Sequence, residues 1–233
     1  MNRLPDNMRP VACIAGPTAS GKSDWAIELA LQVDGEVVNA DSMQVYNELR
    51  ILTARPSAED EAKVPHHLFG HISVWDQYSV GRWLTDVQSV ILDCLARQKV
   101  PVLVGGTGLY FKALVDGLAK IPQVSDATMD EVRQLAKQGV NALRSRAESL
   151  DPVAAKRVLG DDPQRLMRIV SVALGTEKRL SEWQQDTHPV IPKGYWAGAK
   201  LLPERAELYE RIENRYEKML VNGGLEEAKQ ISK

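Results

Sequence analysis

The chain contains 233 residues, of which 44% are hydrophobic and 26% are charged, and its formal net charge is −2. A chain of this length buries about 70% of its extended surface on folding, so it needs no disulfide or metal for stability. The near-balanced charge excludes a generally basic surface, and nucleic-acid binding would need a local basic patch. No apolar run approaches the roughly 20 residues of a membrane span, and residues 1–10 lack the apolar segment of a signal peptide. We therefore expect a cytoplasmic protein with no membrane anchor, formed by one large domain or by one domain with a smaller insertion.

The first part of the chain predicts strands that alternate with helices. Residues 11–16 form a short apolar run that ends in glycine, which is typical of a strand buried on both faces. The apolar residues that follow recur at helical spacing and stop at the Asp-Gly pair 34–35. Residues 36–40 predict a second strand, which places Asp41 at its carboxyl end.

Further elements of the same kind follow along the chain. A helix is expected at residues 80–98, where apolar side chains share one face and basic residues stand at the carboxyl end. Residues 101–106 predict a third buried strand, residues 195–202 suit one more, and residues 205–230 predict a helical stretch interrupted by two glycines. The expected fold class is therefore α/β, with a parallel, doubly wound sheet and flanking helices.

The segment 123–194 differs from the rest of the chain because it shows several helix starts and little strand character. Two Asp-Pro pairs, at 151–152 and 162–163, each place a capping acid before a proline at the first helical position. We expect an α/β core formed by residues 1–122 and 195–233, with this segment as a helical insertion.

Cysteine and histidine give no indication of a metal or redox centre. Cys13 and Cys94 lie within apolar runs, so two buried, reduced thiols are expected rather than a disulfide or a nucleophile. His66, His67 and His71 are close in sequence but have no Cys or Glu at a spacing typical of zinc sites. Capping or surface positions are expected for all three.

The strongest motif is a complete P-loop that follows the first strand and opens the first helix. Its glycines let consecutive backbone N–H groups converge on phosphate oxygens, and the helix adds the positive end of its dipole. Lys22 supplies a point charge to the phosphates, and the Ser23 hydroxyl is placed to bind Mg²⁺. The expected diphosphate-binding residues are Gly16, Pro17, Thr18, Ala19, Ser20, Gly21, Lys22 and Ser23. Because kinases, NTPases and some transferases all use this nucleotide-binding motif, it does not identify a reaction.

Two further strand ends carry polar groups that can reach the same ligand. Asp41 is a candidate for three roles: a magnesium-holding acid, a general base acting on an acceptor, or a helix cap. The glycine-rich turn 105–108 lets the backbone approach a ligand closely, and Thr107 adds a hydroxyl there. This third strand carries no acid where an NTPase often has its magnesium-holding aspartate.

With these motifs in place, the chain resembles the tRNA dimethylallyltransferase family, also called tRNA isopentenyltransferases. The combination of DSMQVY and GGTGLY with this P-loop is the most specific part of the resemblance. The matching stretches are GPTASGKS (16–23), NADSMQVY (39–46), VPHHL (64–68), GGTGLYFKALVDGL (105–118), DPVAAKR (151–157), DDPQRLMR (161–168) and LYERIENRYEKML (208–220).

The resemblance implies a P-loop kinase-like core with a helical insertion that contacts tRNA. It implies transfer of a dimethylallyl group from dimethylallyl diphosphate to the exocyclic N6 amine of the adenosine on the 3′ side of the anticodon, with Mg²⁺. We expect such an enzyme to act as a monomer. A general base is useful because the lone pair of that amine is delocalised into the ring, and the departing diphosphate needs positive charge around it.

The resemblance also implies roles for individual residues. Asp41 would be the general base, Thr107 would help to hold diphosphate and acceptor, and Arg211 would contact the diphosphate. Residues implied to bind tRNA are Asp41, Ser42, Met43, Gln44, Gln164, Arg165, Leu166, Met167 and Arg168. Residues 144–179 contain eight Lys or Arg and five Asp or Glu, a local net charge of +3 that suits RNA.

The chain departs from the family's pattern in one loop. Where the family usually has GxDIGTAKP, residues 48–56 read ELRILTARP, with Glu48, Arg50 and Leu52 in place of Gly, Asp and Gly. The path of this loop is therefore less well predicted than the motifs around it. The family's chains usually continue past the last residue of this one with more basic sequence. If contacts are missing, we expect tRNA affinity to fall more than diphosphate binding.

Other functions remain open from the residues alone. An adenylate isopentenyltransferase would prenylate free nucleotide and would need no tRNA-binding insertion. A P-loop small-molecule kinase would use Asp41 to activate a hydroxyl and would turn over ATP. A tRNA-binding module without catalytic activity is a further alternative to prenyl transfer onto tRNA.

Overall fold

The computed structural model describes residues 10–232, and the chain divides into two compact units. We call residues 1–115 with 189–233 the core unit, and residues 116–188 the insertion unit. Residues 1–9, for which the sequence predicts no signal peptide, lie outside the described part of the chain. The two segments of the core unit meet where the insertion leaves and returns, because the Leu114 carbonyl accepts hydrogen bonds from Val190 N at 2.9 Å and Ile191 N at 3.2 Å.

The core unit contains a five-stranded sheet in the order β3-β2-β4-β1-β5, in which every neighbouring pair is parallel. Its strands are β1 (Val11–Ala15), β2 (Gly35–Asn39), β3 (His66–His67), β4 (Val100–Gly105) and β5 (Trp196–Lys200). The predicted α/β fold with a parallel sheet is therefore confirmed. β3 was not predicted because a strand of two residues leaves no periodic pattern.

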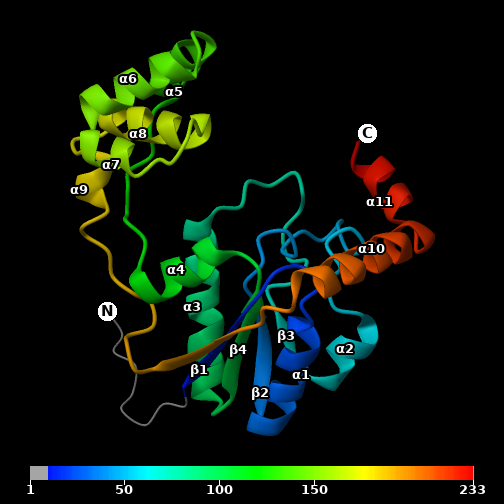
Figure 1. Ribbon diagram of the computed structural model, residues 1–233. Coiled ribbons are helices and arrows are strands. Elements are labelled where there is room, and N and C mark those ends of the chain that lie inside the picture. The colour runs from blue at the N-terminus through cyan, green and yellow to red at the C-terminus, as the bar shows by residue number, and fades with distance from the viewer. Residues whose placement is uncertain (1–9, 233) are drawn as a thin grey trace. The chain divides into compact units, whose positions relative to one another are not determined.

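Helices cover both faces of this sheet (Figure 1). On one face, α3 (Val80–Ala96) and α4 (Gly108–Asp116) pack against Cys13 and Leu103. On the other face, α1 (Lys22–Val33) packs against Ile14 and Val102. Successive residues of β1 and β4 point to opposite faces, as the pleat of a strand requires. Because both faces are covered, the central strands read as continuous apolar runs.

Three other helices complete the core unit. α2 (Ala58–Lys63) begins at a capping box in which the Ser57 hydroxyl and the Asp60 carboxylate bind each other's backbone N–H groups. α10 (Arg205–Val221) and α11 (Gly224–Ile231) are separated by Gly223, whose φ of 95° is a left-handed conformation that favours glycine.

The insertion unit, all of whose residues the structure describes, contains helices and no strand. Its helices after α4 are α5 (Asp126–Lys137), α6 (Val140–Leu150), α7 (Pro152–Lys156), α8 (Pro163–Gly175) and α9 (Leu180–Trp183). Asp151 caps α7 by accepting from Ala154 N at 3.0 Å, and its second oxygen accepts from Ser181 N at 2.8 Å. Asp162 caps α8 as its Asp-Pro pair predicts. Within residues 10–232, no helix is long and apolar enough to cross a membrane.

Candidate active site

The P-loop connects the carboxyl end of β1 to the start of α1. Ala19 and Gly21 have positive φ values of 61° and 83°, which turn the chain sharply at these two positions. The loop is tight, because a β-carbon placed on Gly16 would lie 2.7 Å from the Ser20 Oγ atom. That hydroxyl is buried and has no hydrogen-bond partner among the described residues. A buried hydroxyl without a partner inside this loop is a group that a phosphate oxygen could pair with.

Lys22 begins α1, and its ammonium group rests on the loop, where Nζ donates to the Pro17 carbonyl at 3.0 Å. Burial lowers the pKa of Lys22, the charge of Asp41 opposes that change, and the charge of Arg215 adds to it. Lys22 therefore stands close to both an anion and a second cation.

Asp41 follows β2 and is positioned by Asn39. The Oδ1 atom of Asn39 accepts from Asp41 N at 2.8 Å, and its Nδ2 atom donates to the Asp41 carbonyl at 3.0 Å. Oδ1 of the Asp41 carboxylate accepts from Met43 N at 2.9 Å, so Oδ2 is the oxygen left for a ligand. A β-carbon on Gly106 would lie 3.3 Å from Asp41 Oδ2, which is a tight contact. The glycine at this position therefore leaves the Oδ2 atom accessible. The sequence did not identify Asn39, although it lies in the NADSMQVY stretch.

Thr107 and Ser42 lie side by side because β4 ends against the backbone that follows β2. A β-carbon on Gly105 would lie 2.1 Å from the Ala40 carbonyl oxygen, so only glycine allows this approach. The Thr107 hydroxyl accepts from Ser42 N at 2.9 Å and donates to Ser42 Oγ at 3.2 Å. The structure therefore places Asp41, Ser42 and Thr107 together; for Asp41 and Thr107 this agrees with their predicted positions at strand ends.

Two arginines of α10 reach the P-loop side of the core unit. Arg211 Nη1 lies 3.7 Å from the position of a β-carbon on Gly21, and its Nη2 pairs with Glu207 at 2.5 Å. Arg215 donates from Nη2 to the Thr53 carbonyl at 3.3 Å, while its buried Nε has no partner among the described residues. Burial lowers the pKa of Arg215, and the charge of Asp41 opposes that change.

Arg215 was not singled out from the sequence, although the signal was present. The stretch RIENRY spaces its two arginines four residues apart, which places both on one helix face. In the structure, the charge of Arg215 acts on Lys22 and the charge of Asp41 acts on Arg215.

Of the other residues implied to bind the acceptor, Met43 is exposed and Gln44 faces a neighbouring loop. The Gln44 side-chain amide donates to the Thr53 carbonyl at 3.0 Å and to the Ala54 carbonyl at 2.8 Å. Both of its N–H groups are therefore used within the protein.

The residues implied to bind tRNA in the insertion unit all lie on α8. Gln164, Arg165 and Arg168 are exposed, and Arg165 pairs with Asp162 at 3.2 Å. Leu166 is fully buried in the core of the insertion unit, and Met167 packs partly against it. Gln164, Arg165 and Arg168 are therefore the exposed side chains of this set, Met167 is partly buried, and Leu166 is not accessible to a ligand.

Mg²⁺ fits the residues at the start of α1. Ser23 is exposed in the first turn of that helix, and its hydroxyl makes no hydrogen bond to any described residue. Mg²⁺ prefers hard oxygen ligands and usually keeps several waters while it binds substrate phosphates. One free hydroxyl beside a phosphate-binding loop is a suitable protein ligand for it.

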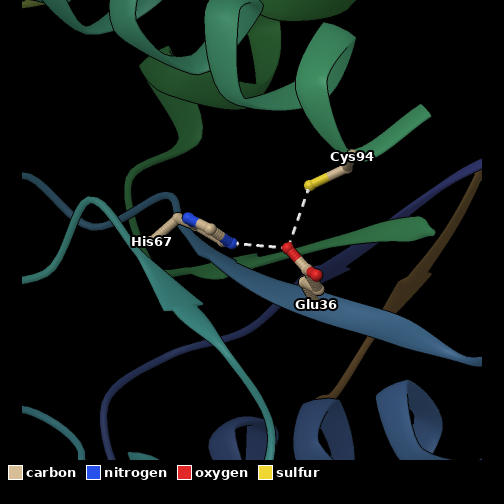
Figure 2. A group of neighbouring side chains, drawn as sticks. All are labelled: Glu36, His67 and Cys94. Atoms are coloured by element: carbon tan, nitrogen blue, oxygen red, sulfur yellow. Dashed lines mark hydrogen bonds and ion pairs between the residues drawn. The ribbon is translucent and has the colours of Figure 1, made fainter. Parts of the chain in front are cut away.

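A separate cluster of Glu36, His67 and Cys94 has ligand atoms within 4.8 Å of one another (Figure 2). His67 Nε2 lies 2.7 Å from Glu36 Oε2. The expectation of a capping or surface position is therefore wrong for this histidine. Arg97 already binds both carboxylate oxygens, at 2.5 and 2.7 Å. Burial raises the pKa of the Cys94 thiol to about 12, which disfavours the thiolate that a metal needs. The cluster is a charge-paired structural contact between β2, β3 and α3.

Comparison with known proteins supports the same assignment. The sequence profile of IPP transferases matches residues 44–233, and that of isopentenyl transferases matches residues 9–66. A tRNA dimethylallyltransferase from Maricaulis maris (strain MCS10) is 48% identical over 221 residues, which are 94% of this chain and 72% of the relative. Another, from Caulobacter sp. (strain K31), is 47% identical over 228 residues, which are 97% of this chain and 73% of the relative.

Solved structures of similar proteins have the same fold. A eukaryotic dimethylallyltransferase acting on tRNA is 28% identical with a TM-score of 0.81, over 96% of this chain but only 56% of that protein. The full-length tRNA isopentenylpyrophosphate transferase of Bacillus halodurans is 30% identical with a TM-score of 0.62, over 96% of this chain and 70% of that protein. The P-loop, the Asp41 strand end and the profile match over most of the sequence agree: the chain belongs to the IPP transferase family.

Proposed function

We propose that the chain transfers a dimethylallyl group from dimethylallyl diphosphate to the exocyclic N6 amine of the adenosine on the 3′ side of the anticodon in tRNA. The observation that carries the proposal is the position of the Asp41 carboxylate beside the P-loop, because a β-carbon on Gly106 would lie 3.3 Å from Asp41 Oδ2 and 3.5 Å from the Gly16 carbonyl oxygen. The charges of Asp41 and Arg215 both act on Lys22. A carboxylate with one unused oxygen stands there beside two cations and a phosphate-binding loop. That arrangement suits an acceptor that must lose a proton next to a leaving group that gains negative charge.

In the proposed reaction, the nitrogen of the amine forms a bond to C1 of the dimethylallyl group as the bond from C1 to the diphosphate oxygen breaks. Asp41 Oδ2 accepts the proton that the nitrogen loses, and the electron pair of the broken bond leaves with the diphosphate. Asn39 holds the backbone of Asp41 on both sides, so the carboxylate is oriented before the acceptor arrives. Thr107 and Ser42 lie beside it and line the acceptor side.

The leaving diphosphate is held by the P-loop residues Gly16–Ser23 and by three cationic side chains. Lys22 acts from within the loop, and Arg211 and Arg215 act from α10. Ser23 would hold Mg²⁺, which supplies further positive charge to the diphosphate when bound. Each of these charges stabilises the transition state more than the ground state, because negative charge on the diphosphate grows as the bond breaks.

The tRNA part of the proposal rests on the relatives, which are named tRNA dimethylallyltransferases, and on the exposed face of α8. Gln164, Arg165 and Arg168 present one amide and two cations on that face, and we propose that residues 123–194 contact tRNA through it. The target base must leave its stack to reach an enclosed site, as in other enzymes that modify bases. The proposed reaction takes place in the cytoplasm, where tRNA is modified, and we propose a monomeric enzyme.

Incubation of the protein with radiolabelled dimethylallyl diphosphate, Mg²⁺ and unmodified tRNA tests the proposal. We expect label on the adenosine next to the anticodon, no requirement for ATP, and no labelled product from AMP, ADP or ATP used as acceptors. Label on free nucleotide but not on tRNA would instead indicate an adenylate isopentenyltransferase. Consumption of ATP without any use of the allylic diphosphate would indicate a kinase.

A further inference from the structure

The loop Ile51–Ala54 lies in the segment where this chain departs from the family's pattern, and α11 holds it. The Glu227 carboxylate accepts from Ile51 N at 2.9 and 3.1 Å and from Leu52 N at 2.8 Å. A carboxylate that accepts two adjacent backbone N–H groups fixes the orientation of both peptide planes. These bonds join residues that are 175 and 176 positions apart in the chain.

The other side of the same loop is bound by two residues of the candidate active site. The Thr53 carbonyl accepts from Gln44 Nε2 at 3.0 Å and from Arg215 Nη2 at 3.3 Å. The Ala54 carbonyl accepts from Gln44 at 2.8 Å. The Thr53 bond is the only hydrogen bond that the structure gives to the Arg215 guanidinium within residues 10–232.

The contact between α11 and the loop is also sterically close. Gly224 is buried at the start of α11, and a β-carbon there would lie 3.4 Å from Leu52 Cδ2 and 2.8 Å from the Met219 carbonyl oxygen. The leucine at position 52, where the family usually has glycine, therefore packs against a glycine of α11. Apolar contact and hydrogen bonds thus act at the same place.

We infer that Glu227 is a positioning residue for the diphosphate subsite. It fixes the loop Ile51–Ala54, and the Thr53 carbonyl of that loop fixes the Arg215 guanidinium beside Asp41 and Lys22. Without this anchor the guanidinium samples more rotamers, and ordering it on the diphosphate costs more conformational entropy. The inference rests on the proposed function only in naming the diphosphate as the ligand of Arg215.

The test measures binding of inorganic pyrophosphate with Mg²⁺ by calorimetry, so that it requires neither tRNA nor turnover. We expect Glu227→Ala to weaken pyrophosphate binding about tenfold, the size of one charge-assisted hydrogen bond. Hydrogen exchange of the Ile51 and Leu52 amides should accelerate in the same variant. Glu226→Ala is the matched control. Glu226 is exposed on the same helix and makes no hydrogen bond or ion pair with any residue between 10 and 232, so its replacement should leave both measurements unchanged.

A double-mutant cycle separates positioning from a general loss of structure. If Glu227 acts through Arg215, adding Glu227→Ala to an Arg215→Ala protein should change pyrophosphate affinity by less than about twofold. Equal effects in both backgrounds, or unchanged affinity despite faster amide exchange, would overturn the inference. Should the alanine variant not fold, Glu227→Gln takes its place in the cycle. The glutamine keeps one acceptor oxygen. A pyrophosphate affinity between that of the wild type and that of Arg215→Ala would support the inference, whereas wild-type affinity would overturn it.

The outcome is distinguishable from failure of the proposed function. Coupling between Glu227 and Arg215 in pyrophosphate binding, together with an absence of label on tRNA, would keep the inference and reject the prenyl transfer. Labelled tRNA without coupling between Glu227 and Arg215 would keep the prenyl transfer and reject the inference.

Discussion

Asn39 binds the backbone of Asp41 through both ends of one side-chain amide, at 2.8 Å to its N–H and 3.0 Å to its carbonyl. Asn39 is itself fully buried, its Nδ2 also donates to the Leu68 carbonyl, and its own carbonyl accepts from Trp83 Nε1 at 3.0 Å. The aspartate thus projects from a backbone that the protein interior determines. In the proposed reaction, this preorganisation means that little energy is spent on orienting Asp41 as the base.

Replacing Asn39 with alanine should lower kcat about tenfold or more, because Asp41 loses both contacts that orient it. The KM for dimethylallyl diphosphate should change much less, since the P-loop is untouched. The variant also leaves buried polar groups unpaired, which should cost about 1–3 kcal/mol of unfolding free energy. Steady-state kinetics and urea unfolding measure the two effects. A raised KM with normal kcat would contradict the assigned role.

Asp41→Asn should reduce prenyl transfer by roughly 10²–10⁴-fold, because the amide cannot accept the proton of the attacking amine. Binding of the allylic diphosphate should persist, as measured by equilibrium dialysis. Unchanged turnover would remove Asp41 from the mechanism.

Arg215→Ala should lower kcat/KM for dimethylallyl diphosphate by about 10²-fold, since a half-buried cation beside the leaving group is lost. Arg211→Ala should have a smaller effect, because Arg211 is exposed and already pairs with Glu207. Arg215→Lys should recover only part of the loss, as lysine cannot bond the Thr53 carbonyl and the diphosphate with one rigid fork. Steady-state kinetics of the three variants, measured side by side, test this order of effects. Equal losses of kcat/KM in Arg211→Ala and Arg215→Ala would contradict the larger role assigned to Arg215.

The Glu36 cluster predicts a pH-dependent contribution to stability. The hydrogen bond from Arg97, helped by those from His67 and Cys94, lowers the pKa of Glu36 from 4.5 to about 2. Because the folded-state pKa is the lower one, the stabilisation is fully present above about pH 4.5 and is lost as the pH falls toward 2.

Glu36→Gln should therefore lower the free energy of unfolding by about 1–3 kcal/mol near neutral pH, and this difference from the wild type should shrink below pH 4.5. Urea unfolding at several pH values measures it. Asp93→Asn removes the exposed partner of Arg97 and serves as the control, for which we expect a change below about 1 kcal/mol. A Glu36→Gln difference that stays constant down to pH 2 would contradict the linkage.

Both cysteines should be inert in the folded protein. Cys13 and Cys94 are free and buried, as predicted from the sequence, and burial raises the pKa of each to about 12. A disulfide reagent at pH 8 should react with neither thiol until denaturant is added, after which two thiols should titrate. Reaction of one thiol before unfolding would show local opening around it.

The sheet could be predicted because its central strands are continuous apolar runs that end in glycine or a polar residue. The elements that were not predicted lack such a signal. α2 has no buried residue, so only the capping box at Ser57 and Asp60 marks it. α4 begins at Gly108, inside a stretch that was interpreted as a binding motif rather than as a helix. β3 contains only His66 and His67, which are polar.

In the candidate site, the P-loop, Asp41 and Thr107 could be predicted because each follows a predicted strand directly. Arg215 could not be separated from Arg211 by sequence, since both share a helix face and only burial distinguishes them. The contact of Glu227 with the loop Ile51–Ala54 joins distant parts of the chain through backbone groups, which leave no mark on residue identity.

The hydrogen bonds from Val190 and Ile191 to Leu114 close the core unit at the base of the insertion unit. A module attached through one closed junction can be lengthened, shortened or replaced while the catalytic scaffold keeps its own connections. Under the proposed function, recognition of tRNA by the insertion unit and chemistry at the diphosphate in the core unit can therefore diverge at different rates during evolution. A chimaera that joins this core to the insertion of a relative would exchange the choice of tRNA and retain the chemistry at the diphosphate.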